Sequence, residues 1–446
     1  MIEPTTLVTV ALCVFAFGLA SRRIERSPLT APMLFSTIGL LAGPMCFGLI
    51  DLHIDGATTH VVIEVTLVLV LFTDAARIRM RELRRGYQLP FRLLLIGMPL
   101  TIGAGTLLAQ PFFPSMSWAE LALLAAVLAP TDAALGLVVV NSVRVPVRIR
   151  QAINVESGLN DGIAVPIVAV LLTAAIVANG NQVATEHGSW SGLSFAAAQI
   201  GLGPLAGALV AGPAGWLVQR AFDNNRINRA YQHFAGVAIA LGAFGTAEWI
   251  GGNGFLAAFV AGLVIGNTSE SLCKHLQEFA EDEGQLLALI AFLVFGAVML
   301  PPALTALDWR AGAYIALSLT VIRMVPVAVS LIGTRLQTRS VLFLGWFGPR
   351  GLATILFALL VAEADTIAHH ERLFQVATLT VAASILAHGL TAAPFAKRYS
   401  RWVDSIRQSQ PSSPECGDAP DLPVRIRMHE RRKLPPDAES DGNQAK

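Results

Sequence analysis

Polar and acidic residues interrupt an apolar stretch of the sequence, INVESGLNDGIAVPI, at residues 153–167. In a helix, Ser157 and Asp161 are four residues apart and share one face, which offers a hydroxyl and a carboxylate. Hard oxygen donors of this kind suit an alkali cation or a proton. Glu156 and Asn160 have the same spacing on the adjoining face, which we expect to hold a structural partner.

Other ionisable residues also fall within apolar segments. With Glu156 and Asp161, the set comprises Asp74, Asp132, Arg323 and Arg350. An ionised side chain at the bilayer centre costs about 2.5–3.5 kcal/mol on insertion scales. Six unpaired ones would cost on the order of 15–20 kcal/mol, more than the stability of a typical protein. We therefore expect partners inside the helix bundle, where such groups normally mark an ion path.

Partners can be assigned to some of these side chains. We predict that Arg323 in LTVIRMVPVAVS pairs with Glu156, because an arginine on Asp161 would prevent that carboxylate from exchanging a proton for a cation. Asp74 is either ion-paired or solvated at the end of its segment, or part of an inner vestibule. For His388 we expect hydrogen bonding between helices rather than proton transfer.

Two apolar segments contain interruptions. In LAPTDAALG, Pro130 removes a backbone donor and Thr131 and Asp132 can engage the freed groups, so we predict a broken helix. Its unwound carbonyls could bind a cation, and Asp132 could offset the positive end of a half-helix. The second interruption, GWFGPRGLATIL, carries Arg350, which either neutralises the negative ends of half-helices or extends to the cytoplasmic surface. Two such segments are typical of an inverted-repeat transporter.

The composition indicates an all-α polytopic membrane protein. Of its 446 residues, 54% are hydrophobic and 14% charged, and about thirteen segments are long enough to span a bilayer as helices. Lys and Arg (32) balance Asp and Glu (31), which gives no indication of a nucleic-acid partner. No His/Cys/Asp cluster has transition-metal spacing and no Gly-rich loop resembles a phosphate site, so we predict no cofactor.

The distribution of basic loops predicts the orientation and the domains. SRRIER, RIRMRELRRGYQ and QRAFDNNRINRA are basic, whereas DLHIDGATTH and PFFPSMSW contain no Lys or Arg. The positive-inside rule then places the N-terminus outside and the C-terminus in the cytoplasm. We expect residues 1–400 to form the membrane domain, with core and dimerisation parts interleaved, and residues 401–446 to form a polar, disordered tail.

Six motifs resemble those of the monovalent cation:proton antiporter family, NhaP-type sodium/proton exchanger branch. They are PTDAALG, ESGLNDGIAVP, GGNGFLAAFVAGLVIGN, VIRMVPV, GPRGLATILFALL and SILAHGLTAAPFAKRY. The resemblance implies an antiporter of the cell membrane that contains two broken, crossing helices. It also implies that the protein forms a homodimer in the lipid bilayer. It implies exchange of Na⁺, or of K⁺ or Li⁺, for H⁺. The Asn-Asp pair implies that this exchange is electroneutral.

The resemblance also implies roles for individual residues. Asp161 would bind the alkali cation or the proton, with Ser157 and the backbone of Thr131 as further ligands. Asn160 would take part at the site and, with Glu156 and Arg323, keep it in shape. Asp132 and Arg350 would balance the charges of the crossed half-helices.

Two other classes of function remain as alternatives. A passive cation channel would also use broken helices, but a charged pair in mid-membrane favours a gated site over an open pore. An intramembrane hydrolase would use Ser157 or an Asp132/Asp161 dyad, but Ser157 lacks a nearby base in the sequence. We therefore predict a transporter and not an enzyme.

Overall fold

Apolar segments of this chain form helices because a backbone in lipid must satisfy its own hydrogen bonds. The computed structural model describes most of the chain. The described residues are 3–24, 27, 29–52, 57–78, 88–140, 142, 145–178, 184–185, 188–189, 192–228, 232–268, 284–409 and 413–416.

The first part of the bundle leads up to a long helix that carries the ESGLND motif. In chain order its elements are α1 (Pro4–Ile24), α2 (Ala31–Ala42), α3 (Ala57–Ala76), α5 (Gln88–Arg92), the π-helical turn η1 (Leu93–Gly97), α6 (Met98–Ala109), α7 (Trp118–Val127), the 3-10 turn η2 (Ala133–Gly136), α8 (Leu137–Val140) and α9 (Val147–Ala178).

The second part begins with a hairpin of two strands, each two residues long, and includes α19, the longest described helix. Its elements are β1 (Ala184–Thr185), β2 (Gly188–Ser189), α10 (Gly192–Asp223), α11 (Gln232–Trp249), α12 (Gly254–Thr268), the π-helical turn η4 (Phe295–Met299), α14 (Leu300–Thr305), α15 (Trp309–Leu319), α16 (Val321–Ser330), α17 (Thr338–Trp346), α18 (Leu352–Ala362), α19 (His370–Ser409) and the 3-10 turn η5 (Pro414–Cys416).

The predicted all-helical membrane architecture is confirmed. Among the described residues, 7 helices are long and apolar enough to cross a membrane, and 5 more apolar helices are shorter. The short helices include one half-helix from each predicted interruption. These are α7, which precedes the first interruption, and α18, which follows the second.

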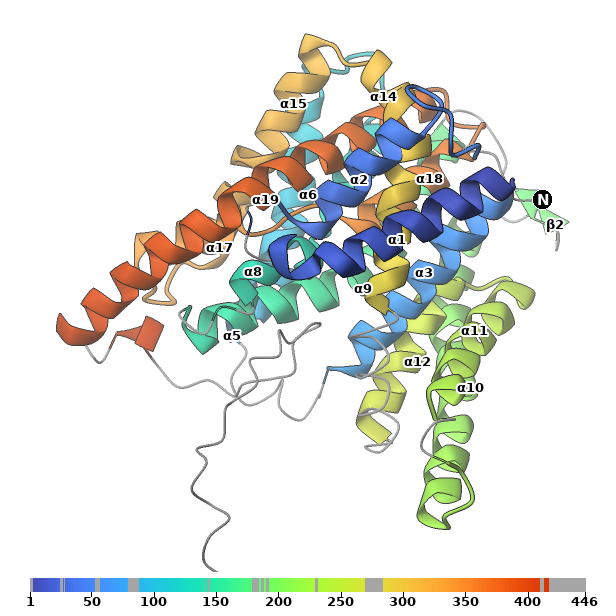
Figure 1. The fold of residues 1–446 in the computed structure, drawn as a ribbon. Coiled ribbons are helices and arrows are strands. Elements are labelled where there is room, and N and C mark those ends of the chain that lie inside the picture. The colour runs from blue at the N-terminus through green and yellow to red at the C-terminus, as the bar shows by residue number, and fades with distance from the viewer. Residues whose placement is uncertain are drawn as a thin grey trace, which may run out of the picture.

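Close helix contacts depend on small residues. Helices α10, α11 and α12 pack against one another, and α12 also packs along α3 (Figure 1). At the α12–α3 contact, a Cβ on Gly262 would overlap the backbone carbonyl of Phe72. Helix α1 lies at the edge of the bundle, because only 6% of its most apolar 18-residue stretch is buried. Its exposed leucines and Phe15 are therefore available to lipid.

The ordered chain extends beyond the predicted end of the membrane domain. Helix α19 continues to Ser409, and η5 then packs at the start of α17. The side chain of Glu415 is fully buried there and accepts hydrogen bonds from the Gln337 N–H (2.7 Å), the Ser340 hydroxyl (3.0 Å) and the Ser413 hydroxyl. The prediction of a disordered tail is wrong for residues 401–409 and 413–416. Residues 417–446 lie outside the described part.

Glu415 stabilises the start of α17 as a charged cap. Its carboxylate lies at the positive end of that helix, and the Arg148 guanidinium anchors the same turn by donating to the Pro414 carbonyl (2.9 Å). Burial opposes ionisation of Glu415. The hydrogen bonds from Ser413, the Gln337 N–H and Ser340 outweigh this and lower the pKa of the carboxyl below its usual 4.5.

This pKa difference predicts a pH-dependent stability. The folded-state pKa of Glu415 is below the unfolded value, so its contribution is present above about pH 4.5 and lost as the pH falls through the folded-state pKa. We expect Glu415→Gln to lower the melting temperature of the purified protein at pH 7 and to have progressively less effect below pH 4.5. Asp404→Asn, an exposed acid on α19, is the control. A pH-independent difference would contradict the assignment.

Candidate functional site

Two interrupted helices meet in the middle of the bundle. Five residues, 128–132, separate the end of α7 from the start of η2, and five residues, 347–351, separate the end of α17 from the start of α18. The two interruptions are joined backbone to backbone, because the Asp132 N–H donates to the Pro349 carbonyl (2.7 Å). Both predicted broken helices are therefore present, and their unwound segments touch.

The carboxylate of Asp132 lies at the N-terminus of α18. Its Oδ2 accepts a hydrogen bond from the Leu352 N–H (3.1 Å). A carboxylate at this position lies at the positive end of the helix dipole, where an acidic group is stabilising. The contact is tight, since a Cβ on Gly351 would overlap the Asp132 side chain. Glycine at residue 351 is thus what allows the two interruptions to approach.

A polar cluster connects the first interruption to α9. The Thr131 hydroxyl lies 3.0 Å from the Ser157 hydroxyl and accepts a hydrogen bond from the Asn160 amide Nδ2 (2.6 Å). All three side chains are buried. The Oδ1 of Asn160 has no hydrogen-bond partner among the described residues. The cluster therefore presents a buried amide oxygen and two hydroxyls from α9 and the unwound segment.

This arrangement adds a contact that helical periodicity does not predict. Periodicity places Asn160 on the face of Glu156, and the family resemblance implies a role for the Thr131 backbone. In the structure, Asn160 and Ser157 both contact the Thr131 side chain. Residues three apart on a helix are also neighbours, so a single partner between them can join the two faces.

Asp161 follows this cluster along α9. It lies one turn after Ser157 and immediately after Asn160, and its residue exposure is 6%. The buried part of α9 thus carries, in succession, Glu156, Ser157, Asn160 and Asp161.

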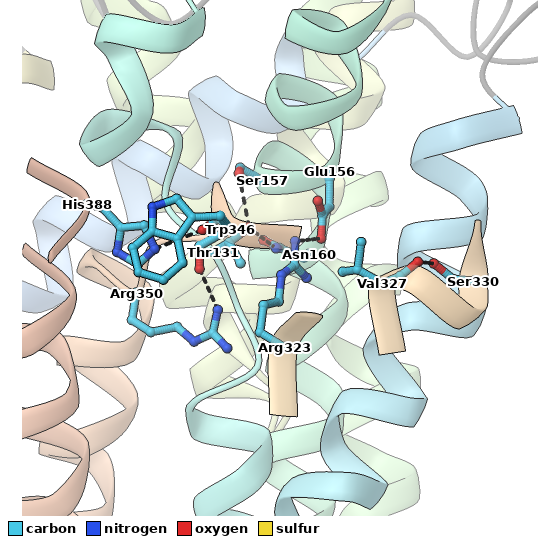
Figure 2. Close-up of polar contacts among 11 residues, drawn as sticks. Thr131, Glu156, Ser157, Asn160, Arg323, Val327, Ser330, Trp346, Arg350 and His388 are labelled. Atoms are coloured by element: carbon cyan, nitrogen blue, oxygen red, sulfur yellow. Dashed lines mark hydrogen bonds and ion pairs between the residues drawn. The ribbon is translucent and has the colours of Figure 1, made fainter. Parts of the chain in front are cut away.

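Glu156 pairs with Arg323 from α16. The Arg323 Nη2 lies 2.5 Å from the Glu156 Oε1, and each residue is only 2% exposed (Figure 2). The predicted ion pair is present. Because the pair places opposite charges from α9 and α16 in contact, it neutralises both and joins the two helices.

Arg350 points into the bundle. It is 1% exposed, and its Nη1 donates to the Gly348 carbonyl (2.6 Å), directly after the C-terminus of α17. Of the two alternatives left open by the sequence, extension to the cytoplasmic surface is therefore wrong. The contact agrees with a cation that neutralises the carbonyl end of a half-helix.

Asp74 and His388 occupy separate positions. On α3, the Asp74 Oδ1 lies 3.8 Å from the Arg77 Nη1, as expected for an ion-paired helix end. The ring of His388 on α19 contacts the Trp346 carbonyl on α17 through Nε2 (2.9 Å) (Figure 2). The predicted hydrogen bond between helices is therefore confirmed.

The donor set fits a hard cation rather than a transition metal. Within the described ranges, no group of three or more His, Cys, Asp or Glu side chains could hold a metal ion. Hydroxyl, amide and carboxylate oxygens are instead the ligands that alkali cations accept.

Comparisons with known proteins agree with this geometry. A family model described as "Sodium/hydrogen exchanger, transmembrane" matches residues 7–398. The K(+)/H(+) antiporter NhaP of Alkalimonas amylolytica is 26% identical over 387 residues, which cover 84% of this chain and 63% of that protein. The K(+)/H(+) antiporter NhaP2 of Shewanella oneidensis is 26% identical over 371 residues, covering 82% and 62%. The chain thus spans less than two thirds of the length of these relatives.

A solved structure shares the fold. The sodium proton antiporter MjNhaP1 of Methanocaldococcus jannaschii superposes with a TM-score of 0.66 at 18% identity, covering 90% of this chain and 98% of that one. This match shows the arrangement of helices.

Loss of one member of the buried ion pair should destabilise the protein. Arg323→Ala leaves Glu156 buried and uncompensated, which typically costs about 3–5 kcal/mol. We expect a lower folded yield by size-exclusion chromatography and a lower melting temperature, partly recovered in the double variant Glu156→Gln/Arg323→Met. Arg407→Ala, at an exposed arginine on α19, is the control. A stable Arg323→Ala protein would contradict the assignment.

An added methyl group should disturb the crossing of the interrupted helices. Gly351→Ala forces the Asp132 carboxylate away from the Leu352 N–H, and overpacking of this kind costs about 1–3 kcal/mol. We expect a lower melting temperature than that of Gly312→Ala, where a Cβ on α15 would meet nothing within 4 Å. Equal melting temperatures for the two variants would show that the crossing is not closely packed.

Proposed function

Because the chain belongs to the transmembrane sodium/hydrogen exchanger family, a family of transporters, we propose that it exchanges a monovalent cation for H⁺ across the cell membrane. The observation that carries this proposal is the buried carboxylate of Asp161 on α9, beside the polar cluster at the crossing of two interrupted helices. The protein itself is a multi-pass membrane protein.

One carboxylate suffices for the coupling. Asp161 is neutralised by a cation or by a proton, but the empty, ionised form carries a net charge that is costly to move through the bundle. Only the two loaded forms then cross, in opposite directions, which gives one cation for one proton and no net charge. Because both ligands compete for Asp161, the rate should fall at low pH, where protons occupy the site, and at high pH, where the return step lacks its proton.

Oxygen atoms around Asp161 would complete the cation site. The hydroxyls of Ser157 and Thr131 belong to the cluster beside it, and the Asn160 Oδ1 has no hydrogen-bond partner among the described residues. In this assignment Asn160 holds Thr131 through its amide nitrogen and offers its oxygen to the ion. The Glu156–Arg323 pair keeps α9 in register with α16.

The choice of cation rests on comparison. The curated relatives are named K(+)/H(+) antiporters, whereas the solved structure is of a sodium proton antiporter. We propose Na⁺ first, with K⁺ and Li⁺ as further candidates. We also propose a homodimer, with the N-terminus outside and the basic loops in the cytoplasm.

The alternatives receive less support. A passive channel needs an open path, whereas the buried Glu156–Arg323 pair and the joined interruptions favour a gated site. A hydrolase needs a base on its nucleophile, but in the described structure the hydroxyl of Ser157 contacts that of Thr131, which is no base.

A liposome assay tests the proposal. Purified protein is reconstituted with a pH-sensitive dye inside, an imposed pH gradient, and Na⁺, K⁺ or Li⁺ added outside. We expect at least one cation to collapse the gradient without dependence on membrane voltage, and Asp161→Asn to abolish exchange. Asp365→Asn, at an acid whose side chain is 91% exposed, is the matched control.

Each failure would have a separate meaning. Exchange that persists in Asp161→Asn would refute the site assignment. Exchange that depends strongly on voltage would refute electroneutrality, and no response to any of the three cations would refute the proposed function.

A further inference from the structure

A chain of hydrogen bonds spans the second interruption from α19. The Nε2 of His388 contacts the carbonyl of Trp346, the last residue of α17, at 2.9 Å. The Nδ1 of His388 lies 3.1 Å from the Ser384 Oγ, which also accepts a hydrogen bond from the Arg350 N–H (2.7 Å). One turn of α19 is thus attached to both sides of residues 347–349.

Both ring nitrogens of His388 have partners. The Trp346 carbonyl can only accept, so the Nε2 carries a proton. The Nδ1 lies 2.9 Å from the Ser384 carbonyl and 3.1 Å from the Ser384 hydroxyl, and that hydroxyl accepts from the Arg350 N–H. A buried ring that is held at both nitrogens suits a fixed structural link.

Trp346 is held by more than its carbonyl. Its indole Nε1–H donates to the Thr391 Oγ1 on α19 (3.0 Å), and its ring lies 5.1 Å from the ring of His388, centroid to centroid. The C-terminal end of α17 is therefore attached to α19 at three points. Such an end cannot move independently of α19.

The segment between these anchors makes the contacts of the crossing. The Pro349 carbonyl accepts the Asp132 N–H, and the Gly348 carbonyl accepts the Arg350 guanidinium. Gly348 also lies directly against the Arg323 guanidinium, where a Cβ would overlap it. The conformation of residues 347–351 consequently sets the position of Asp132 and of its neighbour Thr131.

We propose that His388, together with Ser384, is a positioning residue for the ion site. It holds the second interruption in the conformation that seats Pro349 on Asp132, and thereby places Thr131 against Ser157 and Asn160. It acts through the crossing and does not carry the transported proton. This inference rests on the proposed exchange activity.

Variants of the two residues test the proposal in the liposome assay. In His388→Gln the amide nitrogen can still donate to the Trp346 carbonyl, whereas His388→Leu removes both contacts and Ser384→Ala frees the Arg350 N–H. Because these variants leave a buried polar group unsatisfied, we expect a half-saturating cation concentration about tenfold higher in the Leu and Ala variants. The half-saturating concentration of His388→Gln should stay within about threefold of the wild-type value, since the glutamine keeps a donor for the Trp346 carbonyl. All of them should keep the pH optimum.

Thr380→Val is the matched control, because the buried Thr380 hydroxyl bonds only the Val376 carbonyl of its own helix in the described structure. Its half-saturating concentration should equal that of wild type. A general packing defect in α19 would instead raise it in Thr380→Val as well, and would overturn the proposal.

Hydrogen exchange of backbone amides provides a measurement that does not depend on transport. Peptides that contain Asp132 and Arg350 should exchange faster in His388→Leu and Ser384→Ala, and at the wild-type rate in His388→Gln. If the wild type exchanges no cation, the proposed function fails, and these amides still decide whether the link holds the crossing.

Three further results would overturn the proposal. The first is unchanged half-saturation in Ser384→Ala, which decides the matter if His388→Leu does not fold. The second is slower exchange in His388→Gln with a shifted pH optimum, which would make His388 a proton carrier. The third is unchanged amide exchange at Asp132 and Arg350 in the Ala variant.

Discussion

The hydrogen bond from the Asp132 N–H to the Pro349 carbonyl is the contact on which the centre of this protein depends. It joins two segments that have left the helical conformation, and each segment thereby satisfies a backbone group that would otherwise be unpaired in a bilayer. Prolines make both interruptions necessary, and Gly351 makes their approach possible. The ends of four half-helices are consequently brought to one place.

Charges inside the bundle follow from this crossing. The carboxylate of Asp132 lies at the start of α18, the guanidinium of Arg350 contacts the carbonyl after α17, and Glu156 pairs with Arg323. Each of these groups is compensated by a helix end or by an opposite charge. Asp161, the other carboxylate of α9, lies one turn after Ser157 and is the residue at which we propose that the cation and the proton compete.

Helix α17 links the crossing to the surface of the protein. Its first turn is capped by the carboxylate of Glu415, and its last residue is attached to α19 by the carbonyl and the indole of Trp346. Both ends of the half-helix are therefore fixed by segments that follow it in the chain. A displacement of α19 would be transmitted to the interruption that holds Arg350, and from there to Thr131.

The sequence alone determined the helical membrane fold, the two interruptions and the pairing of Arg323 with Glu156. These follow from segment length, from proline chemistry and from the cost of an unpaired charge in lipid. Only the tertiary structure decided that Asn160 shares the Thr131 hydroxyl with Ser157, that Arg350 turns inward and that Glu415 is buried against α17. Periodicity gives the angle of a side chain on its own helix, but its partner depends on how unwound segments and distant helices pack, and sequence spacing does not encode this.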